Sequence, residues 1–165
     1  MFRKMRRSKQ ELKREESIAV LERNTAGVLG LAGDGGYPYT VPMSYVYDDN
    51  KIYFHSGREG HKVSAIKNCD KASFCVIDKD EVVSLEYTTY FRSVIVFGRV
   101  AFVKDEKEIR YAIDLLARKY APNDTAENRK AAIEKEYNQL AIAVMKIEHM
   151  TGKEAIELVR AKTSE

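Results

Sequence analysis

The stretch 93–103 most constrains what this chain can fold into, and it reads SVIVFGRVAFV. It is long and rich in β-branched residues, which favour extended strands over helices. We therefore expect a central β-strand here. Further segments of this character alternate with turn signals, such as the glycines of 33–36 and the Asp-Asp-Asn loop at 48–50. The other expected strands cover 27–32, 37–47, 51–56, 72–78, 83–90 and 140–148, with a hairpin over 37–56.

Helical periodicity occurs between these strands and at the two ends of the chain. Ser8 and Glu11 have the spacing of a capping box, which predicts the start of a first helix. Asp105 is placed to cap a later helix whose apolar stripe includes Ile113 and Leu116 and which ends before Pro122. The other expected helices cover 8–24, 58–68, 125–139 and 153–161.

Six or seven mainly antiparallel strands with helices at the edges indicate an α+β fold. A closed or split barrel suits so many short strands, because closure removes exposed sheet edges. Pro42 lies inside the expected strand 37–47, although proline cannot donate to a strand ladder. It indicates either an edge strand or a bulge that turns backbone groups toward a ligand.

The composition is that of a globular protein, with 44% hydrophobic and 32% charged residues among 165. A chain of this length fits one domain, which we expect to span 1–165. No apolar stretch is long enough to cross a bilayer, and no apolar signal segment follows the basic N-terminus. We therefore expect a soluble cytoplasmic protein that does not associate with membranes.

The formal net charge of +3 is distributed unevenly. Residues 1–14 form a basic arm with seven lysines and arginines and one glutamate, so the arm carries +6 and the remainder −3. A basic arm can contact the phosphates of a nucleic acid. The rest of the chain, however, lacks a second basic stripe or an aromatic platform for single strands. We therefore favour an arm that is solvated or docks on a partner subunit over one that binds nucleic acid.

The cysteine and histidine patterns predict no metal site. Cys69 and Cys75 form no CxxC motif, so neither a zinc site nor a disulfide framework is expected, and Cys75 is interpreted as a reduced core thiol. Only two histidines are close in sequence, and no carboxylate has ligand spacing on the same element. The chain also lacks a nucleophile elbow, a Walker loop and a GxGxxG motif, which disfavours hydrolase chemistry.

The densest polar cluster is the segment 55–62, which reads HSGREGHK. It leads from an expected strand into an expected helix. Glycines let a backbone approach an anion closely, and the N–H groups at a helix start point outward toward it. A phosphate site is therefore one interpretation. An ordinary polar loop, with His55 as a satisfied sheet residue and His61 as a first-turn helix residue, is the other.

Several longer motifs occur in a specific order. They are GYPYTVPMSYVY at 36–47, KIYFHS at 51–56, EGHK at 59–62, YTTYFRSVIVFGR at 87–99 and HMTGK at 149–153. Together they resemble the 5-nitroimidazole resistance (Nim) proteins, which belong to the pyridoxamine 5′-phosphate oxidase-like FMN-binding split barrels. The resemblance extends over about residues 20–156. It implies a mainly antiparallel split β-barrel of six to seven strands with peripheral helices.

The resemblance also implies a homodimer with one FMN in each of two clefts at the interface. The residues that would line the isoalloxazine ring are Val41, Pro42, Met43 and Ser44, which would account for the proline in that strand. His55 and Ser56 would contact the ribityl phosphate. His61 and Lys62 stand where pyridoxamine phosphate oxidases have an Arg-Lys pair on the phosphate, so a histidine replaces an arginine here.

The function implied by the resemblance is that of an FMN-dependent oxidoreductase that reduces nitroimidazoles or related nitro compounds. The flavin would carry the redox chemistry. His61 matches the Nim motif and is the candidate catalytic residue, for proton delivery or for anchoring an electron donor, while a purely phosphate-binding role is the alternative. A non-catalytic protein that binds flavin or haem is the alternative function, with His55 or His61 as the axial ligand.

Overall fold

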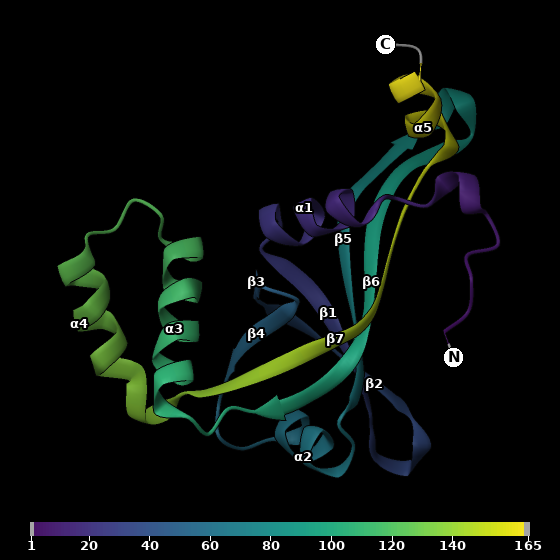
Figure 1. Cartoon of the computed structure of the whole chain (residues 1–165). Coiled ribbons are helices and arrows are strands. Elements are labelled where there is room, and N and C mark those ends of the chain that lie inside the picture. The colour runs from purple at the N-terminus through teal and green to yellow at the C-terminus, as the bar shows by residue number, and fades with distance from the viewer. Residues whose placement is uncertain (1, 164–165) are drawn as a thin grey trace.

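A computed structural model describes residues 2–163, which contain seven β-strands and five α-helices (Figure 1). The strands are β1 (Ala26–Ala32), β2 (Pro38–Ser44), β3 (Val46–Asp48), β4 (Lys51–Ser56), β5 (Lys71–Val83), β6 (Thr88–Phe102) and β7 (Ala141–Glu154). The α-helices are α1 (Arg14–Arg23), α2 (His61–Asn68), α3 (Glu106–Tyr120), α4 (Ala126–Glu136) and α5 (Ile156–Thr163). Short 3₁₀ helices are η1 (Ser8–Gln10), η2 (Asp34–Gly36), η3 (Ser84–Glu86) and η4 (Tyr137–Gln139).

All seven strands form one sheet in the order β2-β1-β5-β6-β7-β4-β3, and every neighbouring pair is antiparallel. The two edge strands, β2 and β3, follow one another in the chain and are joined by Tyr45 alone. Edges connected by a single residue must lie close together, so the sheet curls round until its two edges approach each other. The predicted α+β split barrel, with seven antiparallel strands, is confirmed.

Tyr45 stabilises the junction of β2 and β3 through hydrogen bonds to two helices. Its side chain is fully buried, and its hydroxyl donates to the Leu21 carbonyl of α1 at 2.8 Å. Its backbone N–H donates to the Tyr120 hydroxyl of α3, also at 2.8 Å. Burial raises the pKa of the Tyr45 phenol, so the group remains a neutral donor. The junction of the two edge strands is thus tied to helices on either side.

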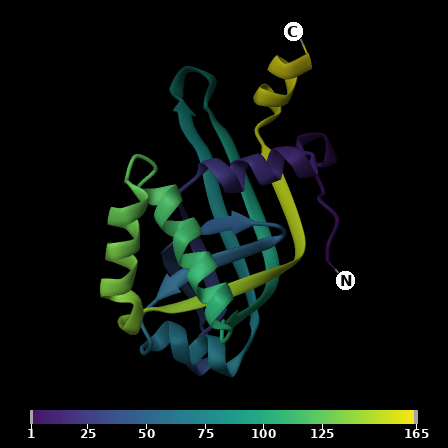
Figure 2. The same ribbon diagram turned by 60° about the vertical axis from the view of Figure 1, so that its left-hand side comes forward.

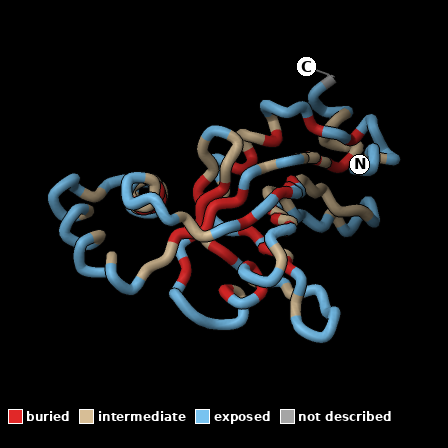
Figure 3. The backbone as a smooth tube through the Cα atoms, turned by 60° about the horizontal axis from the view of Figure 1, so that its bottom comes forward, coloured by how far each residue is buried: buried red, intermediate tan, exposed pale blue. Residues whose placement is uncertain are grey.

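Strand alternation places the main core inside the barrel. Along β6, Val94 and Val96 are fully buried, while Ile95 and Phe97 point outward and are exposed. Phe74 of β5 meets the valines inside, in the same cluster of buried side chains. Figure 3 shows the buried backbone gathered in these strands, whereas the helical ends and loops are mostly exposed.

The helices α3 and α4 form a pair beside the barrel (Figure 2). α3 buries Ile113 and Leu116 against Ile142 of β7, which makes a second hydrophobic cluster on the outer side of the sheet. Asp105 caps α3 by accepting a hydrogen bond from the Glu108 N–H at 3.0 Å, which confirms the predicted cap. α4 buries none of its residues completely and contacts mainly α3.

Two strand predictions are wrong. The expected strand 37–47 is divided at Tyr45: β2 pairs with β1, and only β3 forms the hairpin with β4. The segments 72–78 and 83–90 belong to β5 and β6, which form one long hairpin that also contains 93–103. The end of β5 was missed because an irregularity in the β5–β6 register between Ile77 and Lys79 interrupts the strand periodicity. The turn was missed because its left-handed residue is Tyr87, with φ 50°, and not a glycine.

Pro42 occupies an edge strand, as one of its two interpretations required. It pairs with Val28 in an unbroken β1–β2 register. β2 has β1 as its ladder partner on one side only, so a residue without an N–H is tolerated.

The helix predictions are right in existence and wrong at their ends. The segment 8–24 contains η1 and then α1, which begins at Arg14. The Glu16 carboxylate accepts a hydrogen bond from the Lys13 N–H at 3.0 Å, so this pair, and not Ser8 and Glu11, marks the start of α1. The predicted helix 58–68 begins at His61, 125–139 is α4 followed by η4, and β7 continues through Glu154 before α5 begins. Within residues 2–163, no helix combines the length and apolarity needed to span a membrane.

The basic arm packs against β7 of the same chain. Glu11 forms an isolated β-bridge with Lys153, and the Leu12 N–H donates to the Gly152 carbonyl at 2.9 Å. Phe2 stacks on His149 of β7, with ring centroids 4.5 Å apart. The arm is therefore held along β7 at several points and is not simply a solvated tail.

Candidate functional site

The helix α2 begins inside the polar cluster 55–62, and Gly60 is the residue at which the backbone turns into the helix. Gly60 is the N-cap residue with φ 115°, a conformation that glycine adopts without strain. No side chain caps this end, and the first turn contains no acidic residue. The first N–H groups of a helix, here beginning with His61 and Lys62, have no intrahelical acceptor. Together with the helix dipole they favour an anion at this place.

Ser56, at the end of β4, supplies a buried hydroxyl just before this loop. The residue is 4% exposed, and its Oγ has no hydrogen-bond partner among the described residues. Buried hydroxyls are normally paired, because an unpaired one costs about 1–3 kcal/mol. A phosphate oxygen would satisfy this group, so Ser56 fits the predicted anionic end of a flavin mononucleotide.

Lys62 connects the start of α2 with β2. Its Nζ lies 3.3 Å from the Met43 Sδ, and burial lowers the pKa of its ammonium group. In the part of the chain that the structure describes, no carboxylate pairs with Lys62. A half-buried cation without a counter-charge is suited to an anionic ligand.

His55 and Ser56 are neighbours in β4 but face opposite sides of the strand, as alternation requires. His55 faces α3 and lines a pocket of about 310 Å³ together with Ile113, Leu116 and Tyr120. Burial and, secondarily, the charge of Lys62 lower the pKa of His55, so its imidazole is neutral near pH 7. His55 therefore offers a hydrogen-bond acceptor or a ligand nitrogen to that pocket.

His61 is positioned by one residue of β2 and one residue of η2, which connects β1 with β2. Its ring stacks on Tyr39 of β2, with centroids 4.0 Å apart and an interplanar angle of 22°. Its Nε2 lies 3.5 Å from the Asp34 Oδ2. The His61 side chain is 46% exposed, so its imidazole is held in place yet remains accessible for proton exchange with a ligand or solvent.

The contact between Lys62 and Met43 brings the start of α2 beside β2, and Ser56 ends the strand that leads into this loop. His55 is not brought into this group, because it faces the pocket beside α3. Within β2, Met43 is buried and Val41 is half-buried against the core, while Pro42 is exposed and Ser44 is intermediate. The four residues therefore present alternate faces of one edge strand. A flat ring placed along this edge meets some of them by side chain and others by backbone.

Sequence reasoning missed Tyr39 and Asp34. Both lie more than twenty positions before His61, and only the approach of β2 to the β4–α2 loop brings them beside it. Tyr39 carried a usable signal, because period-two alternation places it on the same side of β2 as Val41 and Met43. Asp34 carried none, since it lies in η2 between strands.

The other singled-out polar residues lie elsewhere. His149 is inside β7, which continues past the expected strand 140–148, and it stacks on Phe2. Cys75 is half-buried, and burial raises the pKa of its thiol, which favours the unreactive protonated form. Within residues 2–163, no group of three histidine, cysteine or acidic side chains lies close enough to hold a metal ion.

Comparison with known proteins identifies the family. A sequence profile for the family described as pyridoxamine 5′-phosphate oxidase matches residues 13–154, which is most of the chain. Among curated proteins, none has a sequence that matches this chain.

Many solved structures share the fold, and three of them illustrate the likeness. A Bacteroides thetaiotaomicron VPI-5482 protein described as a candidate 5-nitroimidazole antibiotic resistance protein is 23% identical, with a TM-score of 0.71 over 87% of this chain and 85% of that one. A FAD-binding protein from Mesorhizobium loti is 26% identical, with a TM-score of 0.64 over 88% and 97%. A FAD- and haem-binding protein from Mycobacterium smegmatis is 21% identical, with a TM-score of 0.73 over 89% and 73%. With its seven-stranded split barrel and its extensive profile match, this chain belongs to the pyridoxamine 5′-phosphate oxidase family.

Proposed function

We propose that this protein is a cytoplasmic, FMN-dependent oxidoreductase that reduces nitroimidazoles or related nitro compounds. The observation that carries the flavin proposal is the unpaired polar groups at one end of the barrel: the Ser56 hydroxyl, the Lys62 ammonium and the open start of α2. The family and the FAD-binding Mesorhizobium loti relative support a flavin. FMN, with its single terminal phosphate, matches one compact anion site.

In this proposal the phosphate lies between Ser56 and the first turn of α2. Ser56 donates its hydroxyl proton to a phosphate oxygen, and Lys62 supplies the neutralising charge from beside Met43. The N–H groups that begin at His61 complete the site. The residues of β2 that would hold the ring system are Val41, Pro42, Met43 and Ser44.

When bound, the flavin supplies the electrons for reduction of the nitro group. The chain would contribute a proton donor, and His61 is the candidate because its accessible imidazole is oriented by Tyr39 and Asp34. A nitro substrate is supported by the description of the Bacteroides thetaiotaomicron relative and by the motif around His61. If His61 only holds the phosphate, its replacement would weaken FMN binding without changing the rate at saturating FMN.

A homodimer is part of the proposal, because the outer face of the sheet is apolar where β1, β5 and β6 meet. Val28 pairs with Cys75, which in turn pairs with Ile95, so these three side chains form a row on one face. Val28 and Ile95 are 37% and 40% exposed, and Phe97 on the same face is 38% exposed. A second copy of the chain would cover this row and enclose the cofactor end.

The alternative is a non-catalytic protein that binds flavin or haem. The observation that favours it is the pocket beside α3, where the neutral imidazole of His55 faces Ile113 and Leu116. Glu136 and Tyr120 also line this pocket, and His55 is exposed at its wall, so a haem would reach the imidazole from the surface. Histidine is a common axial ligand of haem iron. The Mycobacterium smegmatis relative, described as binding FAD and haem, shares the fold.

The visible absorption spectrum of the purified full chain, titrated with FMN and separately with haemin, tests these alternatives. The proposal predicts a perturbed flavin spectrum at saturation and, with a chemical reductant as electron source, flavin reoxidation on addition of a nitroimidazole. Reoxidation that is no faster than with free FMN would refute the reductase activity. A Soret band that is lost in His55→Ala, with no flavin uptake, would establish the haem alternative.

A further inference from the structure

Residues of the basic arm line a second pocket, which lies on the opposite side of the molecule from the proposed cofactor residues. Its volume is about 410 Å³, and it is lined by Arg6, Arg7, Ser8, Lys9, Gln10 and Ile156. The η1 turn shapes it, because the Gln10 N–H donates to the Arg7 carbonyl at 3.0 Å and the segment packs on α5. Figure 1 shows this turn beside α5, far from α2. The pocket shares no residue with the proposed flavin site.

The charge of this pocket is uncompensated. Arg6, Arg7 and Lys9 line it, and the described lining residues include no carboxylate. Elsewhere in the molecule, cationic side chains are paired with carboxylates, as for Arg23, Arg92, Arg99, Arg110, Arg118 and Arg129. Within residues 2–163, none of the three pocket cations forms such a pair. Two arginines and one lysine, all of them exposed, therefore line this pocket without a carboxylate partner.

Gln10 is the second, independent observation. It is 5% exposed and lines the pocket, and its Oε1 has no hydrogen-bond partner among the described residues. A buried amide oxygen is normally paired. The unpaired Gln10 Oε1 therefore offers an acceptor to a donor group of a molecule bound beside Ile156.

From this arrangement we infer that the pocket binds a nucleotide-sized phosphate ester. The phosphate would lie between Arg6, Arg7 and Lys9, since planar guanidinium groups bind phosphate oxygens in pairs. The organic part would lie against Ile156 and pair a polar edge with the Gln10 amide. The volume exceeds what a free phosphate ion fills and lies in the range of pockets for small organic ligands.

Isothermal titration of the full-length chain with AMP, adenosine and inorganic phosphate tests this inference. AMP should bind more tightly than either fragment. The double variant Arg6→Ala/Arg7→Ala should weaken AMP binding about tenfold or more, because it removes charge-assisted hydrogen bonds. The matched control is Arg3→Ala/Lys4→Ala, which removes the same charge from positions of the same arm that do not line the pocket and should change the affinity by about twofold at most. Gln10→Leu should weaken AMP binding and leave binding of inorganic phosphate unchanged.

If the two double variants lose the same AMP affinity, the loss comes from the net charge of the arm and not from the pocket, and the inference is overturned. Equal affinities for AMP and adenosine would also overturn it, because the phosphate would then contribute nothing. Repeating the titration with Lys62→Ala separates the two sites, because Lys62 lies at the start of α2 and does not line the arm pocket. AMP affinity should not change, whereas loss of AMP binding in Lys62→Ala would place AMP at the start of α2 and refute the second site. If the chain binds no flavin at all, the comparison of the arm variants still decides this inference.

Discussion

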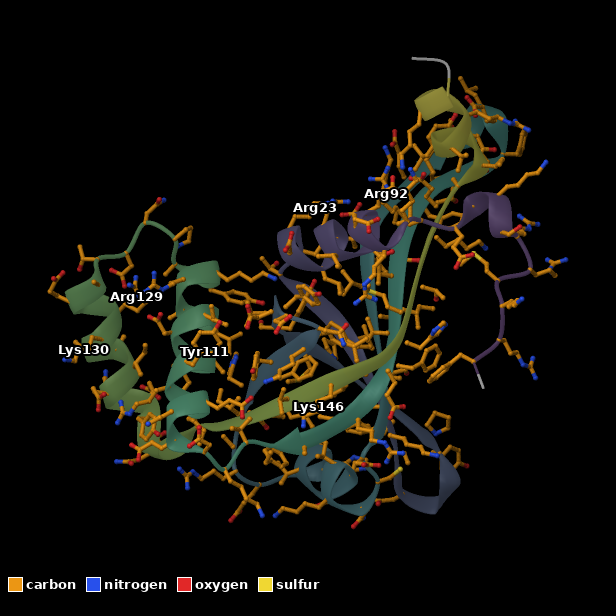
Figure 4. All side chains as sticks on the ribbon, viewed as in Figure 1. Arg23, Arg92, Tyr111, Arg129, Lys130 and Lys146 are labelled. Atoms are coloured by element: carbon orange, nitrogen blue, oxygen red, sulfur yellow. The ribbon has the colours of Figure 1, made fainter. Side chains whose placement is uncertain are left out.

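Replacing Asp78 with asparagine should remove about 2 kcal/mol from the free energy of unfolding at neutral pH. Asp78 accepts hydrogen bonds from Arg23 of α1 at 2.6 Å and from Arg92 of β6 at 3.2 Å, and its side chain is only 6% exposed. Figure 4 shows the two arginines side by side. The Asn24 Nδ2 donates to the same carboxylate at 2.8 Å.

The magnitude follows from the proton affinity of this carboxylate. Burial alone would raise the pKa of Asp78, but the donors Arg23, Asn24 and Arg92 outweigh burial and lower it from 3.8 to about 2. At about 1.4 kcal/mol per pKa unit, this shift corresponds to about 2 kcal/mol. Because the folded-state pKa is depressed, this contribution is complete above about pH 4 and disappears as the pH falls through about 2.

Urea unfolding of the wild type and of Asp78→Asn at several pH values between 7 and 2.5 measures this contribution. The difference in unfolding free energy should be near 2 kcal/mol at pH 7 and 5, and it should shrink below pH 4. Asp80→Asn is the matched control, since Asp80 lies two residues further along β5 and is exposed. It should change stability by less than about 0.5 kcal/mol. A difference for Asp78→Asn that is absent at pH 7, or that is the same at every pH, would refute the reasoning.

Two further substitutions test the packing of the fold. Asp105→Ala should cost about 1 kcal/mol by removing the cap of α3, measured by thermal unfolding, whereas Asp105→Ser should recover most of it; no loss would mean that the cap is unimportant. Gly98→Ala should destabilise the β6–β7 ladder by several kcal/mol or prevent folding, because a β-carbon there would overlap the Lys146 carbonyl. A Gly98→Ala protein with wild-type stability would contradict the β6–β7 register.

The β-branched run at 93–103 and the short strands around it predicted the α+β class, and the resemblance of the longer motifs implied the split barrel. They were insufficient to predict where strands change partners. The break at Tyr45 exists because the barrel closes between β2 and β3, which is a long-range event with no local turn residue to mark it. The tip of the β5–β6 hairpin also has no residue that would mark a turn in the sequence. Its residues Leu85 and Tyr87 are hydrophobic, yet they are almost fully exposed.

The candidate site was only partly visible in the sequence. The cluster 55–62 was identified because its glycines and basic residues are adjacent in the chain. The contacts between Lys62 and Met43 and between His61 and Tyr39 depend on the approach of β2 to α2, which local patterns do not encode. The start of the first helix was predicted at Ser8, because the residue that actually occupies the N-cap of α1, Lys13, is not a typical cap residue.

The central claim is that a flavin phosphate binds between Ser56 and the start of α2. The dissociation constant of FMN, measured by quenching of flavin fluorescence, tests it most directly. Lys62→Ala should weaken FMN binding about tenfold or more, since a half-buried charge-assisted contact is lost. Lys67→Ala, in the last turn of the same helix, should leave the constant nearly unchanged. Equal affinities of the wild type and the Lys62→Ala variant for FMN would contradict the account.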